Sequence, residues 1–99
     1  MIIHDFDEKE FNDLISKDKV ILDFYATWCG PCKMMSKVLE EYNNEEVKII
    51  KINVDKHENI AKKYGVMTIP TLILYENGKE IKKNIGFMPL DLFEKWANE

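Results

Sequence analysis

The stretch VILDFYATWCGPCK, residues 20–33, decides the fold of this 99-residue chain. Residues 20–25 form an apolar run of strand length that only Asp23 interrupts, and residues 27–31 then turn the chain into a new element. The apolar residues that come next recur at helical spacing: Met35, Val38, Leu39 and Tyr42. The stretch therefore predicts a buried strand, a tight turn that holds two cysteines, and a helix.

The segments on either side repeat this alternation. Residues 1–4 can form a short strand, and Asp7 with Glu10 resembles the capping box of a helix that continues through Phe11, Leu14 and Ile15. Residues 47–54 are rich in β-branched residues and predict another strand, followed by a short helix at 59–64. Strands that alternate with helices imply parallel pairing.

The second half of the chain changes character at Asn77-Gly78, a strong hairpin signal, which joins predicted strands at 71–76 and 79–85. Pro89 suits the first position of a final helix with an apolar face of Leu92, Phe93 and Trp96. Core candidates are Phe11, Leu14, Met35, Val38, Leu39, Phe93 and Trp96. We predict an α/β fold in which helices cover a mixed sheet.

The composition is typical of a globular domain and narrows the range of possible partners. Hydrophobic residues make up 45% and charged residues 32%, without a linker or repeat, so we expect a single domain over residues 1–99. The net charge is −4 and every basic side chain is lysine, which argues against a nucleic-acid partner. Residues 1–10 show no apolar run of export or membrane-spanning length, so we expect a cytoplasmic, monomeric protein without membrane contact.

Cys29 and Cys32, the two cysteines of the chain, have a spacing that suits reversible disulfide chemistry. Three residues apart on a helix, their Cα atoms are about 5 Å apart, which a disulfide tolerates. A helix that begins near Pro31 points free N–H groups at Cys29, which favours a thiolate there. Cys29 is thus the expected nucleophile, and Cys32, one turn further in, the resolving thiol.

The alternative is that these two cysteines are two of the four ligands of a zinc site. Zinc would need two further ligands, and the two histidines, His4 and His57, are not spaced as a partner motif. We therefore expect no metal, and read both histidines as ordinary surface residues.

Residues 23–33, DFYATWCGPCK, resemble the active-site segment of the thioredoxin family. The resemblance continues through KINVD at 51–55, KYGV at 63–66, IPT at 69–71, Asn77-Gly78 and Gly86. It implies a thioredoxin fold, a central mixed sheet of five strands flanked by four helices, with the first three strands parallel. Two positions depart from the family pattern: Ser36 stands where many thioredoxins have proline, and Tyr25 where a second tryptophan is common.

The resemblance also implies an activity, namely reduction of protein disulfides through Cys29 and Cys32. It implies no bound cofactor beyond this redox-active disulfide, and a thioredoxin reductase as the electron donor. A carboxylate in a covered parallel strand is buried, which raises its pKa and suits Asp23 to exchange a proton with Cys32. The resemblance places Lys51 beside Asp23.

The same resemblance predicts where substrate proteins bind. It implies a cis peptide bond between Ile69 and Pro70 that faces the cysteines, with an extended substrate segment pairing beside Pro70. The expected docking surface consists of Trp28, Gly30, Pro31, Met67, Ile69, Pro70 and Gly86. Two alternative functions remain. One is an oxidase or isomerase on the same scaffold, and the other is a docking module around Trp28 without redox turnover.

Overall fold

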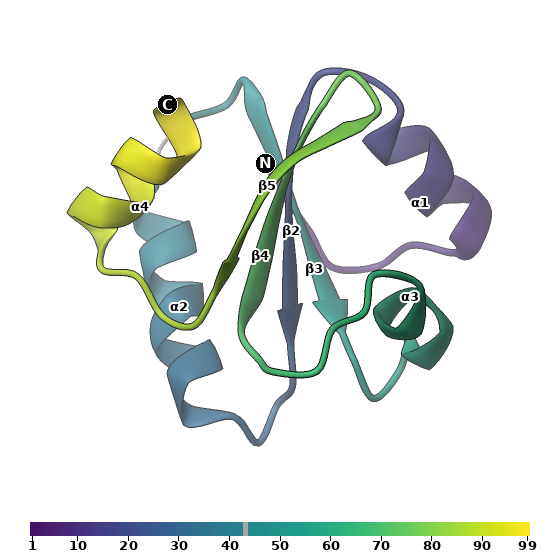
Figure 1. Cartoon of the computed structure of the whole chain (residues 1–99), viewed down its shortest axis with the longest axis horizontal. Helices are drawn as coiled ribbons and strands as arrows, with labels where there is room; N and C mark the ends of the chain where they lie inside the picture. Colours follow the sequence, from purple (N-terminus) through teal and green to yellow (C-terminus); the bar gives the residue numbers. More distant parts are fainter. Residues whose placement is uncertain (43) are drawn as a thin grey trace.

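Alternating strands and helices build one five-stranded sheet with the order β1-β3-β2-β4-β5 (Figure 1). The computed structural model describes residues 1–42 and 44–99. Its elements are β1 (Ile2–Ile3), α1 (Glu8–Ile15), β2 (Lys19–Tyr25), α2 (Gly30–Glu41), β3 (Val47–Asn53), α3 (Glu58–Lys63), β4 (Thr71–Glu76), β5 (Lys79–Ile85) and α4 (Leu90–Asn98). Strands β1, β3 and β2 are parallel, whereas β4 runs antiparallel to β2 and β5 antiparallel to β4. The predicted fold class and strand directions are confirmed.

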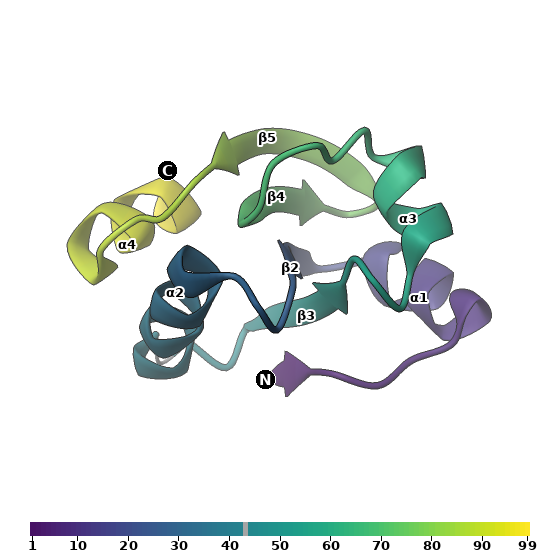
Figure 2. The same cartoon turned by 90° about the horizontal axis from the view of Figure 1, so that it is seen from below.

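The sheet separates two hydrophobic clusters, because successive side chains of a strand point to opposite faces. Ile21 and Ile49 pack with α2 and α4 on one face. Leu22 and Ile50 pack with α1 and α3 on the other. Figure 2 shows the two pairs of helices on opposite sides of the sheet. By the same alternation, Asp23 on β2 and Lys51 on β3 belong to the α2 face.

Local signals in the sequence account for the start of α1 and for the turn between β4 and β5. The Asp7 side chain accepts a hydrogen bond from the Glu10 N–H at 2.8 Å, and the Glu10 side chain accepts one from the Asp7 N–H at 3.3 Å. This confirms the capping box. Asn77 and Gly78 have φ values of 50° and 82°, the left-handed geometry that the tight hairpin turn requires.

Two expectations for α4 were wrong. Pro89 precedes the helix as its N-cap residue instead of occupying the first helical position, since α4 begins at Leu90. Leu92 is 51% exposed, whereas Phe93 and Ala97 are buried. The apolar face of α4 is therefore rotated away from Leu92, because the helix docks on the sheet through the line that joins Phe93 to Ala97. Trp96 is half-buried against the same cluster.

Parallel strands β2 and β3 place their carboxyl ends at the same edge of the sheet, in register from Lys19 opposite Val47 to Tyr25 opposite Asn53. The turn after β2 leads into α2, and the turn after β3 leads into α3. Residues far apart in the sequence therefore meet around the N-terminus of α2.

Candidate active site around Cys29 and Cys32

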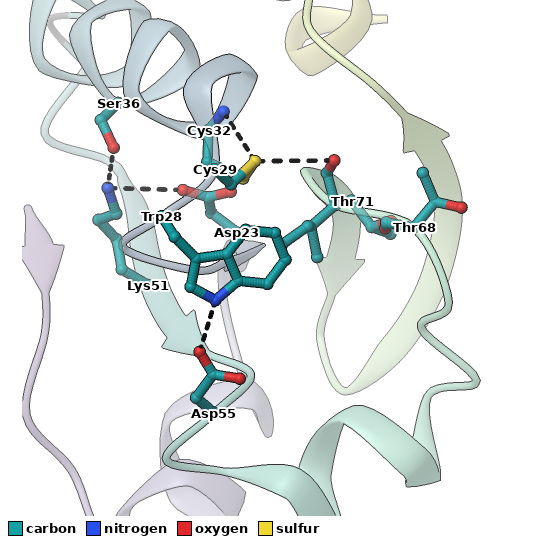
Figure 3. The surroundings of a disulfide bond; sticks show 10 residues. Asp23, Trp28, Cys29, Cys32, Ser36, Lys51, Asp55, Thr68 and Thr71 are labelled. Carbon is teal, nitrogen blue, oxygen red and sulfur yellow. Dashed lines mark hydrogen bonds and ion pairs between the residues drawn. A yellow bond between two sulfur atoms is a disulfide. The ribbon is translucent and has the colours of Figure 1, made fainter.

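Cys29 and Cys32 are joined by a disulfide at the N-terminus of α2, with their Cα atoms 5.2 Å apart. Cys29 is the N-cap residue, and its Sγ accepts a hydrogen bond from the Cys32 backbone N–H at 3.2 Å. Both cysteines are buried, but Cys29 keeps 6% of its surface exposed and Cys32 only 1%, so Cys29 is the more accessible of the two. Figure 3 shows the pair at the first turn of the helix. After reduction, the N–H groups and the positive end of the helix dipole favour a thiolate at Cys29.

The loop before β4 lies against the disulfide. The Ile69–Pro70 peptide bond is cis, as the resemblance implies. Ile69 packs on the two cysteines, and its carbonyl oxygen lies 3.9 Å from Cys29 Sγ. The Gly86 N–H donates to the Pro70 carbonyl oxygen at 2.8 Å, which ties the end of β5 to this loop. Three residues of the expected surface thus come together from two separate parts of the chain.

Asp23 and Lys51 face each other across β2 and β3 at paired register positions. Asp23 is fully buried, and its Oδ2 lies 3.7 Å from Lys51 Nζ. That distance exceeds a hydrogen bond, and the Asp23 oxygens accept none from the residues that the structure describes. Burial raises the pKa of Asp23 from 3.8 to about 6, although the Lys51 charge opposes the rise.

Lys51 itself is buried, with 8% of its surface exposed, which excludes an ordinary solvated surface lysine. Figure 3 shows the Asp23 carboxylate between the ammonium of Lys51 and the disulfide. The placement of this pair therefore agrees with what the resemblance implies.

The surface beside the disulfide carries exposed apolar side chains. Trp28 is 70% exposed, which excludes a core role for this residue. Gly30 and Pro31 are exposed at the start of α2. Met67 is 96% exposed and lines a pocket with Lys83 and Ile85 that does not include the cysteines. Met67 is thus at the margin of this surface at most.

Sequence reasoning missed three contributors to the site. Asp55 Oδ2 accepts a hydrogen bond from Trp28 Nε1 at 2.9 Å. This contact could have been found, because Trp28 follows β2 and Asp55 follows the parallel strand β3, so both lie at one sheet edge. Ser36 and Tyr25 contact the ammonium of Lys51. Ser36 is four positions after Cys32 and Tyr25 two after Asp23, so each shares a side of its element with a site residue, but these local spacings do not show that Lys51 meets them.

Metal-binding clusters and membrane-spanning helices are both absent from the described part of the chain, residues 1–42 and 44–99. No group of three His, Cys, Asp or Glu side chains there is placed to hold a metal ion. None of the helices described has the length and apolar character needed to cross a membrane.

Comparison with known proteins extends the resemblance over the whole chain. The family model described as Thioredoxin matches residues 2–99. The thioredoxin of Bacillus subtilis (strain 168) is 41% identical over 95 residues, which cover 93% of this chain and 91% of that protein. Thioredoxin-1 of Saccharomyces cerevisiae is 43% identical over 83 residues, with 81% of each chain covered.

Solved structures agree with this match. A mutant thioredoxin from Halobacterium salinarum NRC-1 superimposes with a TM-score of 0.90 at 32% identity, covering 98% of this chain and 88% of that one. The oxidized mitochondrial thioredoxin 3 of Saccharomyces cerevisiae gives a TM-score of 0.83 at 39% identity, covering 99% and 95%. With a redox pair at the tip of α2, the chain belongs to the thioredoxin family and is a thiol-disulfide oxidoreductase that reduces protein disulfides and regains its electrons from a reductase.

Proposed function

We propose that Cys29 is the nucleophile and Cys32 the resolving thiol of this reductase. The proposal depends on the position of Cys29 Sγ, which caps α2, accepts a hydrogen bond from the Cys32 N–H at 3.2 Å and is the more exposed of the two cysteines, at 6% against 1%. The sulfur that a substrate can reach is thus also the one whose thiolate the helix stabilises.

The reaction proceeds by two displacements. In the first, the Cys29 thiolate attacks one sulfur of a substrate disulfide, a mixed disulfide forms, and the other substrate sulfur leaves as a thiolate that takes up a proton. In the second, the Cys32 thiolate attacks Cys29 Sγ, the mixed disulfide breaks, and the second substrate thiol is released. Two electrons pass to the substrate, and Cys29 and Cys32 become the disulfide of the present structure.

Asp23 serves the second step in this proposal. Its pKa of about 6 makes it a base near neutral pH for the proton of Cys32, and Lys51 moderates its charge. Substrate proteins dock on Trp28, Gly30, Pro31, Ile69, Pro70 and Gly86, with Met67 at the margin. A partly exposed, apolar and shallow surface suits the extended segments of many proteins better than one small molecule.

The proposal extends to the setting of the protein. It acts as a monomer and forms a single domain over residues 1–99. The single domain is supported by the one sheet, which has a hydrophobic cluster packed on each face. It needs no bound cofactor, its electrons come from a thioredoxin reductase, and its place is a reducing compartment such as the cytoplasm.

Reduction of a protein disulfide, coupled to a thioredoxin reductase and its electron donor, tests these roles. Cys29→Ser should abolish turnover, and Cys32→Ser should also stop it but accumulate a mixed disulfide that mass spectrometry detects. Thr27→Ala, at an exposed neighbour of the pair, is the matched control and should turn over normally. A Cys29→Ser variant that still reduces the substrate would refute the assignment, and a wild type that only binds would support the docking module.

A further inference from the structure

The ammonium of Lys51 has three neighbours on the α2 face of the sheet. Asp23 Oδ2 lies 3.7 Å away, and the ring centroid of Tyr25 lies 4.6 Å away. The third neighbour is the Ser36 hydroxyl, whose Oγ accepts a hydrogen bond from Lys51 Nζ. Figure 3 shows the dashed lines from this nitrogen to Ser36 and to Asp23. The buried ammonium therefore donates a hydrogen bond to a neutral hydroxyl and lies beside a carboxylate to which it donates none.

Ser36 reaches this position because it lies one helical turn after Cys32. Residues four apart on a helix share a face, so Cys32 and Ser36 both point from α2 toward the sheet. A pocket of about 240 Å³ is lined by Tyr25, Cys32 and Ser36, together with Ala26, Thr27 and Lys33. Ser36 is thus beside both the resolving cysteine and the ion pair.

The hydrogen bond to Ser36 competes with one to Asp23. Charge-assisted N–H···O bonds are typically about 2.8 Å long. Lys51 Nζ and Asp23 Oδ2 are 3.7 Å apart, and the Asp23 oxygens accept no hydrogen bond from the residues described. Coulomb attraction varies inversely with distance, so closing this gap from 3.7 Å to about 2.8 Å would strengthen it by about a third.

We propose that Ser36 is a positioning residue: its hydroxyl holds the Lys51 ammonium off the Asp23 carboxylate and thereby keeps Asp23 easy to protonate. The inference rests on the proposed role of Asp23 for its catalytic meaning, since a free carboxylate is the better base for Cys32. A proline at position 36 would have no hydroxyl to offer, so this contact belongs to the sequence at hand.

Few groups other than Lys51 are placed to change the protonation of Asp23. Strand β3 contributes Lys51, whose ammonium contacts Asp23, Tyr25 of β2 and Ser36 of α2. Cys32 and Lys33 of α2 line the pocket beside Ser36. The residue opposite Asp23 on β4 is Leu72, which is apolar and buried. In the oxidised protein Cys32 does not titrate because it is in the disulfide. Lys33 is exposed to solvent, so among the described residues Lys51 is the buried charge that a change at Ser36 displaces toward or away from Asp23.

An NMR titration of the Asp23 carboxyl carbon in the oxidised protein tests the proposal. Ser36→Ala should lower the midpoint by about one pH unit, because the released ammonium moves onto the carboxylate. Alanine is a strong helix former, so α2 should persist. Ser36→Thr keeps a hydroxyl at the same position and should restore the wild-type midpoint.

Ser16→Ala is the matched control, since it removes a hydroxyl at the end of α1 that donates to the Asp13 carbonyl at 2.6 Å. It should leave the Asp23 midpoint unchanged. An unchanged or raised midpoint in Ser36→Ala, or a Thr variant that behaves like the Ala variant, would overturn the proposal. The pH profile of turnover in Asp23→Asn is a separate readout: if it matches wild type, the role of Asp23 as base fails while the titration still decides the role of Ser36.

Discussion

Replacing Asp23 by asparagine removes a buried carboxyl group whose charge the fold disfavours. Asp23 is fully buried, and the pKa rises from 3.8 to about 6 because burial outweighs the attraction of Lys51. An asparagine side chain has nearly the same shape and cannot ionise. The variant therefore isolates the cost of the buried charge as a function of pH.

The difference between the folded and unfolded pKa values sets the size of the effect. Below the unfolded value of about 3.9 both states are protonated, and Asp23 costs nothing. As the pH rises from there to about 6, the unfolded chain ionises while the folded protein does not, so the free energy of unfolding falls. A difference of about 2 pH units corresponds to about 3 kcal/mol, which is then constant at higher pH.

Urea denaturation of oxidised wild type and Asp23→Asn, measured from about pH 4 to about pH 8, reads this cost directly. The gain in stability of the variant should grow by about 2.5 kcal/mol across that range, since the unfolded chain is already partly ionised at about pH 4, and should level off above about pH 6.5. Any difference in packing between asparagine and a protonated aspartic acid adds a constant offset to the whole curve, so the slope is the test.

Asp13→Asn, at an exposed carboxyl group on α1, is the matched control and should track the wild type at every pH. Parallel curves for wild type and Asp23→Asn would refute the reasoning, because they would mean that Asp23 ionises equally in both states.

The other predictions concern a turn, the docking surface and a helix cap. Gly78→Ala should lower the free energy of unfolding, measured with denaturant, by about 1 to 2 kcal/mol, since φ is 82° and a Cβ would lie 3.1 Å from the Ser16 carbonyl oxygen. Gly65→Ala, where φ is 64° and the space is open, should lower it less. An equal loss in both variants would exclude the contact with Ser16 as a cause. Trp28→Ala should raise KM for a protein disulfide several-fold while the melting temperature changes little, because the ring is 70% exposed, and an unchanged KM would remove it from the docking surface. Asp7→Ala should cost about 1 kcal/mol through loss of the α1 cap, a cost that thermal unfolding would detect and that a wild-type melting temperature would contradict.

Elements with a local cause were predictable from the sequence. The capping box at Asp7, the turn at Asn77 and Gly78 and the spacing of Cys29 and Cys32 each depend on residues close together in the chain, and the structure has all three. The α/β class follows from the same local patterns.

The buried face of α4 was not predictable in the same way. Leu92, Phe93 and Trp96 all fit one helical face on paper, but the docking angle of the helix on the sheet selects Phe93 and Ala97 and leaves Leu92 in solvent. Packing between elements, which no window of sequence contains, made that selection.

The sequence alone determined that a disulfide-forming pair opens a helix after a buried strand, because hydrogen bonding and hydrophobic periodicity along a few residues dictate it. Only the tertiary structure decided what surrounds Asp23. Lys51 comes from the next strand, and its ammonium contacts Asp23, Ser36 of α2 and Tyr25 at the end of β2. These contacts join groups up to 28 positions apart in the sequence (23 to 51), and such distances in space depend on strand register and helix docking, which the whole core sets at once.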